Sequence, residues 1–136
     1  MATLRGQRHG GTILVVEDDE DVREMVRVAL EEQGYTVLEA SNGRAALHAL
    51  FATDRPDVRL IISDLEMPLM TGSEMLQVLS SYSRSSRIPV VVVSATRPPH
   101  SPKPHEIVAA WLVKPFGMDE LLDVVEARFL SEPARH

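Results

Sequence analysis

The 136-residue sequence contains no cysteine and no long apolar run. Without cysteine, the chain can form no disulfide, no thiolate metal site and no cysteine nucleophile. No apolar run approaches the roughly 20 residues of a membrane-spanning helix, and the amino terminus lacks the apolar core of a signal peptide. Acidic residues outnumber basic ones by 20 to 14, which argues against a general affinity for nucleic acid or anionic membranes. We therefore expect a cytoplasmic protein.

The rest of the composition is ordinary for one globular domain, with 44% hydrophobic and 25% charged residues. Apolar runs alternate along the chain with amphipathic stretches, and this alternation predicts an α/β fold with a parallel sheet covered by helices on both faces. The expected strands are 12–16, 35–40, a run from Leu60 to Asp64, 89–94 and 111–114. The predicted domain spans 12–130, after a disordered leader at 1–11 and before a tail at 131–136.

Amphipathic periodicity predicts four helices of ordinary length. Gly34 is placed to end the first helix, Ser41-Asn42-Gly43 precedes the second, and Gly72 precedes the third. The last helix is expected at 118–130. Residues expected to face the sheet are, helix by helix, Val22, Met25, Val26, Ala29 and Leu30; Ala46, Leu47, Leu50 and Phe51; Met75, Leu76 and Leu79; and Leu121, Leu122, Val125 and Phe129.

A proline-rich stretch at 97–105 interrupts this alternation between the fourth and fifth strands. Each proline lacks a backbone donor and restricts the residue before it, so a regular helix cannot begin there. Only about 104–110 remains for a further, shortened helix, with Pro104 tolerated at its first position.

Polar residues follow four of the strands where each strand ends. Glu17 and Asp18 follow the first, Asp64 closes the third, Ser94 closes the fourth and Lys114 ends the fifth. Each alone is as well explained by a helix cap, a turn or a surface charge. Because the carboxyl ends of parallel strands meet at one edge of a sheet, we expect them to converge there.

Converging carboxylates repel one another, and a hard divalent cation such as Mg²⁺ would remove that repulsion. Lys114 adds a mobile positive charge and Ser94 a hydroxyl donor. A carboxylate nucleophile, a metal and a cation are the parts that phosphoryl transfer requires. The acidic run continues beyond Asp18, so Asp19 is an alternative metal ligand.

Four motifs occur in order along the chain: Val15-Val16-Glu17-Asp18, Asp64-Leu65-Glu66-Met67-Pro68, Ser94-Ala95 and Lys114-Pro115-Phe116. In order and at nearly the same spacings, they resemble the receiver domain of bacterial two-component response regulators. The resemblance covers about 12–130 and implies a flavodoxin-like, doubly wound five-stranded sheet in the order 2-1-3-4-5. Two residues are added around 53–59, and the proline-rich stretch puts the family's usual dimer face in doubt.

The resemblance also implies roles for individual residues. Asp64 matches the phosphoacceptor, and Glu17 and Asp18 match the acidic pair that holds Mg²⁺ together with Asp64 and the backbone carbonyl of Glu66. Ser94 matches the switch hydroxyl. Further matches are Lys114, the lysine that pairs with the phosphoryl group; Trp111, the aromatic rotamer switch; Pro115, whose preceding bond is typically cis; and Glu66 and Thr96, positions that tune phosphoryl lifetime.

As partners, the resemblance implies a sensor histidine kinase or a histidine phosphotransfer protein, while the downstream target and a homodimer stay open. Two alternatives remain: an interaction module that signals without phosphorylation, and a small Mg²⁺-dependent phosphatase with an aspartyl-phosphate intermediate. The chain lacks room for the phosphatase's cap domain, and Met67-Pro68 does not fit its motif. We therefore expect regulated binding rather than enzymatic turnover.

Overall fold

The computed structural model describes residues 11–52, 57–66, 72–83, 85–98 and 107–130. Its five strands form one parallel sheet in the order β2-β1-β3-β4-β5. The strands are β1 (Thr12–Val16), β2 (Thr36–Ala40), β3 (Val58–Asp64), β4 (Val90–Ser94) and β5 (Val108–Val113). The predicted fold class and strand order are confirmed.

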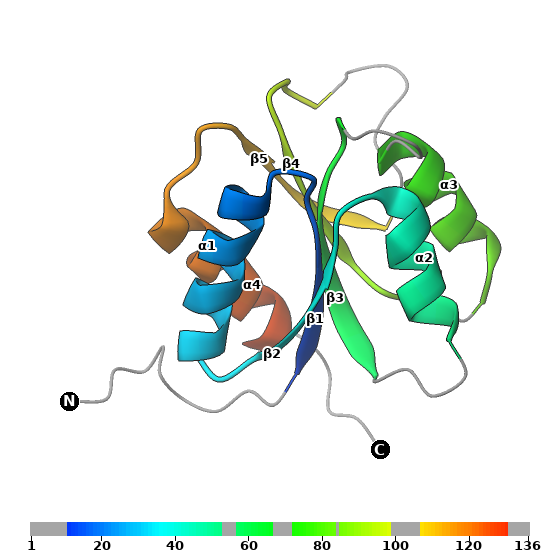
Figure 1. The fold of residues 1–136 in the computed structure, drawn as a ribbon, viewed down its shortest axis with the longest axis horizontal. Helices are drawn as coiled ribbons and strands as arrows, with labels where there is room; N and C mark the ends of the chain where they lie inside the picture. Colours follow the sequence, from blue (N-terminus) through cyan, green and yellow to red (C-terminus); the bar gives the residue numbers. More distant parts are fainter. Residues whose placement is uncertain (1–10, 53–56, 67–71, 84, 99–106, 131–136) are drawn as a thin grey trace.

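In the described residues, four helices cover the two faces of the sheet. They are α1 (Glu20–Glu32), α2 (Gly43–Phe51), α3 (Gly72–Ser81) and α4 (Met118–Leu130). Figure 1 shows α1 and α4 on one face and α2 and α3 on the other. The strand–helix alternation in the sequence thus produces three layers, as expected for parallel strands joined by helical crossovers.

Alternate strand residues supply two separate cores, because successive side chains in a strand point to opposite faces. Toward α1 and α4 the strands bury Ile13, Val15, Leu60, Ile62, Val91 and Val93. Toward α2 and α3 they bury Leu14, Val16, Ile61, Val90 and Val92. The middle of each central strand is therefore apolar on both faces, which is why its sequence is a continuous apolar run rather than an alternating one.

Local signals set the helix ends. Asp19 caps α1, its side chain accepting the backbone N–H groups of Asp21 and Val22, and Asn42 caps α2. Gly34 has a positive φ of 98°, as expected for the glycine that ends α1. Met25 was expected to face the sheet and is instead 59% exposed, because the buried stripe of α1 is limited to Val26 and Leu30.

The prediction of a shortened helix at 104–110 is wrong for Val108, Ala109 and Ala110. These residues begin β5, where Val108 pairs with Val90 and Ala110 with Val91. The first residues of β4 are buried, and their backbone groups need partners; Val90 N–H donates to Ile107 O at 2.8 Å. Pairing of β5 with β4 gives those backbone groups hydrogen-bond partners. One short helical turn in place of the first residues of β5 would leave them unpaired. The earlier part of the predicted helix lies outside the described residues.

The folded part includes Gly11, which was expected in the leader. Gly11 is buried, its carbonyl accepts the Thr36 N–H at 3.0 Å, and a Cβ there would clash with the ring of Phe129. The rest of the predicted leader and the predicted tail lie outside the described residues. Within the described ranges, no helix has the length and apolar character needed to cross a membrane.

Candidate functional site

Asp64 and Lys114 form an ion pair at the carboxyl edge of the sheet. Asp64 is the last residue of β3 and is 3% exposed, while Lys114 follows β5, on the far side of β4. The long lysine side chain crosses the end of β4, bringing its Nζ within 2.7 Å of Asp64 Oδ2. Backbone N–H groups hold both residues of the ion pair in place. Lys114 N–H donates to Ser94 O at 2.7 Å, and Glu66 N–H donates to Asp64 Oδ1 at 2.9 Å.

Glu17 reaches the same lysine from β1. Its Oε1 lies 3.3 Å from Lys114 Nζ, and its Oε2 accepts the Asp19 N–H at 3.1 Å. The Glu17 backbone is held on both sides: its N–H donates to Ala40 O at 3.0 Å, and its carbonyl accepts from Arg23 Nη1 at 2.8 Å. A buried carboxylate is thereby fixed against the ammonium group.

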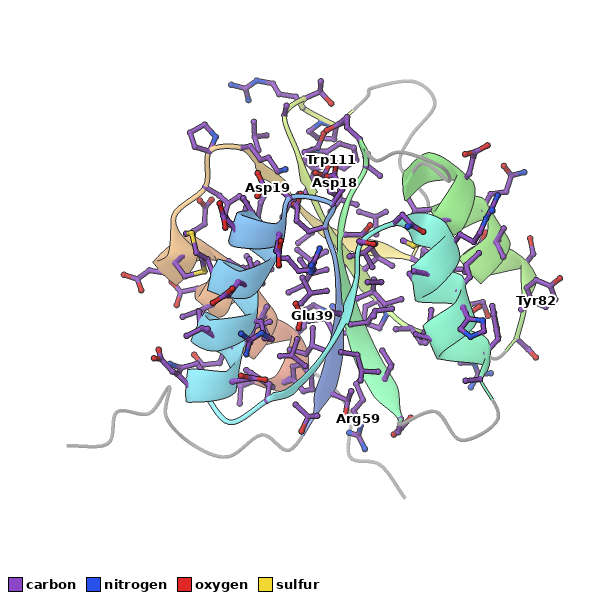
Figure 2. All side chains as sticks on the ribbon, viewed as in Figure 1. Asp18, Asp19, Glu39, Arg59, Tyr82 and Trp111 are labelled. Carbon is purple, nitrogen blue, oxygen red and sulfur yellow. The ribbon has the colours of Figure 1, made fainter. Side chains whose placement is uncertain are left out.

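Asp18 completes a cluster of three carboxylates. Glu17, Asp18 and Asp64 each offer one carboxylate oxygen, and these oxygens all lie within 4.8 Å of one another. Asp18 is exposed whereas the other two are buried, so the cluster opens to solvent on its side. Figure 2 shows Asp18 and Asp19 at the end of the sheet opposite Arg59.

The charges of this cluster do not balance. Burial raises the pKa of Glu17, an effect that the Asp19 N–H opposes, the Asp64 charge reinforces and Lys114 opposes. Burial lowers the pKa of Lys114, but its hydrogen bond to Asp64 and the nearby carboxylate charges outweigh this and leave the pKa raised. One ammonium group faces three carboxylates, and this surplus of oxygen ligands suits a hard divalent cation.

A second network runs beside this cluster along the end of β4. Ser94 Oγ donates to Glu66 Oε2 at 2.9 Å and lies 3.0 Å from Thr96 Oγ1. Thr96 N–H donates to Ser94 Oγ at 3.1 Å, and Trp111 Nε1 donates to Thr96 O at 2.8 Å. A continuous path of hydrogen bonds therefore joins Glu66, two residues beyond Asp64, to the indole of Trp111.

The structure brings the predicted site residues together in these two networks. Glu17, Asp18, Asp64 and Lys114 form the charged cluster; Ser94, Glu66, Thr96 and Trp111 form the hydrogen-bonded path. Asp19 caps α1 instead of joining the carboxylates, which favours Asp18 as the ligand. The Lys114–Pro115 bond is cis, the geometry that the resemblance implies.

Sequence reasoning missed two contacts. Nothing in the sequence marked Arg23 as a support for the Glu17 carbonyl, because its place in the first turn of α1 predicts only an exposed side chain. The Glu66 side chain was also missed: only its backbone carbonyl and its influence on phosphoryl lifetime were anticipated. Its contact with Ser94 depends on how the segment after β3 turns toward β4.

Residues 13–126 match the family model of the response regulator receiver domain. The chain belongs to this family. Among curated proteins, it is 36% identical over 116 residues to the regulatory protein AtoC of Escherichia coli, covering 84% of this chain and 24% of AtoC. It is 35% identical over 120 residues to the phosphate regulon transcriptional regulatory protein PhoB of Pseudomonas aeruginosa, covering 87% of this chain and 51% of PhoB. This receiver thus spans about half, or less, of these relatives.

Solved structures show the same relationship along nearly the full length of both chains. The response regulator TrrA of Thermotoga maritima, solved in complex with Mg²⁺ and BeF, has a TM-score of 0.74 and 29% identity, covering 86% of this receiver and 97% of TrrA. The chemotaxis response regulator CheY4 of Vibrio cholerae also has a TM-score of 0.74 and 29% identity, covering 87% and 98%.

Proposed function

We propose that this receiver accepts a phosphoryl group on Asp64 and uses it to switch a partner-binding face. The arrangement of Asp64 carries the proposal: a buried strand-end carboxylate, 2.7 Å from an ammonium group and clustered with two further carboxylates. A structural ion pair alone would not explain the extra acidic groups, because their mutual repulsion costs stability.

Mg²⁺ is the ion that this donor set fits, since the three carboxylates offer only hard oxygen ligands and one side is open to solvent. Glu17, Asp18 and Asp64 would hold it, with the Glu66 backbone carbonyl as a further proposed ligand. When bound, such an ion offsets the negative charge of a transferring phosphoryl group.

The transfer itself uses one oxygen of Asp64. That oxygen attacks the phosphorus of a phosphohistidine; a new O–P bond forms as the N–P bond breaks, the imidazole leaves, and Asp64 becomes an acyl phosphate. Lys114 stands beside Asp64 Oδ2 and supplies positive charge to the incoming phosphoryl oxygens. Ser94 then turns its hydroxyl toward the same oxygens, and Trp111 changes rotamer.

The phosphohistidine would come from a sensor histidine kinase or a histidine phosphotransfer protein, and the output would be regulated binding to a downstream protein. The carboxylate cluster is compatible with this chemistry because its exposed member, Asp18, leaves a path from solvent. Slow loss of phosphate from Asp64 by attack of water would reset the switch, so we propose a signalling protein without turnover of a separate substrate.

The test is incorporation of phosphate from a small phosphodonor such as acetyl phosphate in the presence of Mg²⁺. The wild-type receiver should acquire one hydroxylamine-sensitive phosphate, detected by intact-protein mass spectrometry, and Asp64→Asn should acquire none. Asp57→Asn is the matched control, because Asp57 immediately precedes the same strand at its opposite end and is exposed there. It should be labelled like the wild type.

Labelling of Asp64→Asn at the wild-type level would contradict the assignment of the acceptor. An unlabelled wild type that still bound a partner would instead favour the phosphorylation-independent interaction module. Continuous release of phosphate from esters over many turnovers would favour the phosphatase.

A further inference from the structure

Glu66 joins Asp64 to β4 through three hydrogen bonds. Its backbone N–H donates to Asp64 Oδ1 at 2.9 Å, and its carboxylate accepts from Ser94 Oγ at 2.9 Å and from Ala95 N–H at 3.4 Å. The residue itself is exposed, whereas Asp64 and Ser94 are buried. An exposed glutamate that turns inward to two donors next to a buried carboxylate needs a specific explanation.

The hydrogen bonds of Ser94 identify the direction in which its hydroxyl points. A serine hydroxyl has one proton to donate and two lone pairs with which to accept. The proton goes to Glu66 Oε2, and the lone pairs accept from Thr96 N–H and from the Thr96 hydroxyl. With Glu66 in place, Ser94 has no remaining proton to offer to a group on Asp64.

We propose that the Glu66 carboxylate occupies, in the resting protein, the two donors that a phosphoryl group on Asp64 would take. This inference rests on the proposed function and adds that the Glu66 carboxylate competes with the phosphoryl group for the same two donors. A phosphoryl group carries more negative charge than a carboxylate and has more acceptor oxygens, so it forms the stronger bonds to Ser94 Oγ and Ala95 N–H. Two anions also repel one another, and the Glu66 side chain is therefore displaced when Asp64 is phosphorylated.

Displacement of Glu66 would change the path to Trp111. Ser94 would rotate its proton away from Glu66, and the bonds that tie Ser94 Oγ to Thr96 would rearrange. The Thr96 carbonyl holds the indole N–H of Trp111 at 2.8 Å, so the indole would respond to this change. Glu66 is thus a positioning residue: it holds the switch path in the resting arrangement and opposes occupation of the acceptor site.

The experiment measures binding of beryllofluoride, a phosphoryl mimic, at saturating Mg²⁺ through the fluorescence of Trp111, the single tryptophan of the chain. Glu66→Ala removes the competitor and should raise the apparent affinity about tenfold, the effect of losing roughly one charge-assisted hydrogen bond. Glu66→Gln removes the charge but keeps an acceptor for Ser94 or Ala95. It should give a clearly smaller gain than Glu66→Ala.

The comparison of these two variants distinguishes two effects of Glu66 on binding: occupation of the Ser94 and Ala95 donors, and charge repulsion of the bound anion. If Glu66 acted only through its charge, Glu66→Ala and Glu66→Gln would gain equally, and the proposal would be overturned. A further readout needs no ligand: in metal-free buffer, Glu66→Ala should change the Trp111 emission, while Glu66→Gln should stay nearer the wild type. Glu74→Ala, at an exposed position on α3, is a control for the loss of one negative charge.

The outcomes also distinguish this inference from the proposed function. If the wild type binds beryllofluoride, and both Glu66 variants bind it with wild-type or lower affinity, competition by Glu66 is refuted. The assignment of Asp64 as the acceptor is then unaffected. If the wild type itself fails to bind beryllofluoride and to take up phosphate, the proposed function fails first. The thermal melting of each variant, recorded alongside, shows whether a change in affinity arises from loss of fold.

Discussion

Neutralising Asp18 should stabilise the metal-free receiver while weakening its response to Mg²⁺. The Asp18 carboxylate lies within 4.8 Å of oxygens from both Glu17 and Asp64, and among the described residues the ammonium group of Lys114 is the one that pairs with this cluster, through Glu17 and Asp64. Asp18→Asn keeps the size of the side chain and removes one of the three charges. The site is thereby relieved of two repulsive pairs.

The magnitude follows from Coulomb's law. For two unit charges at 4.8 Å, the repulsion is about 0.9 kcal/mol in bulk water and about 3.5 kcal/mol at an effective dielectric constant of about 20. Asp18 is exposed, which places its pairs toward the lower figure, and loss of its attraction to Lys114 offsets part of the gain. We expect Asp18→Asn to raise the free energy of unfolding by about 1–2 kcal/mol in the absence of metal.

Urea unfolding in EDTA and in saturating Mg²⁺ measures both effects. The wild type should gain about 2.7 kcal/mol at a Mg²⁺ concentration of 100 times its dissociation constant, and Asp18→Asn should gain much less at the same concentration. Asp19→Asn is the matched control: it makes the same chemical change one residue away, and asparagine retains the helix cap. Its stability and its Mg²⁺ response should match the wild type. Equal stability of Asp18→Asn and wild type in EDTA, with equal gains in Mg²⁺, would refute the reasoning.

Two other predictions concern Glu17 and Gly34. Because burial raises the pKa of Glu17 above 4.5, its contribution to stability is present below about pH 4.5 and is lost as pH rises through the folded-state pKa. In EDTA, the wild type should therefore lose stability relative to Glu17→Gln across that window, measured by urea unfolding at several pH values; a constant difference would contradict the shift. Gly34→Ala should cost about 1–2 kcal/mol because φ is 98°, whereas Gly117→Ala, with no atom within 4 Å of the added Cβ, should be nearly neutral by thermal melting.

The fold could be predicted because its main signals are local and agree with one another. The apolar runs 60–62 of β3 and 90–93 of β4 are uninterrupted by polar residues, so they fit strands covered on both faces. The carboxylate cluster could be predicted for a related reason. Once the strands are known to be parallel, their carboxyl ends share one edge, and the residues at or just after the ends of β1, β3 and β5 meet there.

The incorrect predictions concern features that the local sequence does not determine. By their own propensities Val108 favours a strand whereas Ala109 and Ala110 favour a helix, and pairing with buried β4 decides for the strand. Met25 occupies a helical position at the margin of the apolar stripe, and the packing of α1 on the sheet leaves it outside. Both outcomes depend on partners that are distant in the sequence.

The contact between Glu66 and Ser94 is of the same kind, and it bears on how the site works. The two residues are 28 positions apart, and only the folded sheet places the segment after β3 beside the end of β4. Glu66 bonds to Asp64 through its backbone N–H and, through its carboxylate, to Ser94 at the start of the hydrogen-bonded path that ends at Trp111. A change at Asp64 can shift that path only by as much as the two arrangements differ in their interactions with it. Under the proposed function, the strength of the bonds from Ser94 and Ala95 to Glu66 would therefore set the free energy that a phosphoryl group must exceed before Trp111 responds.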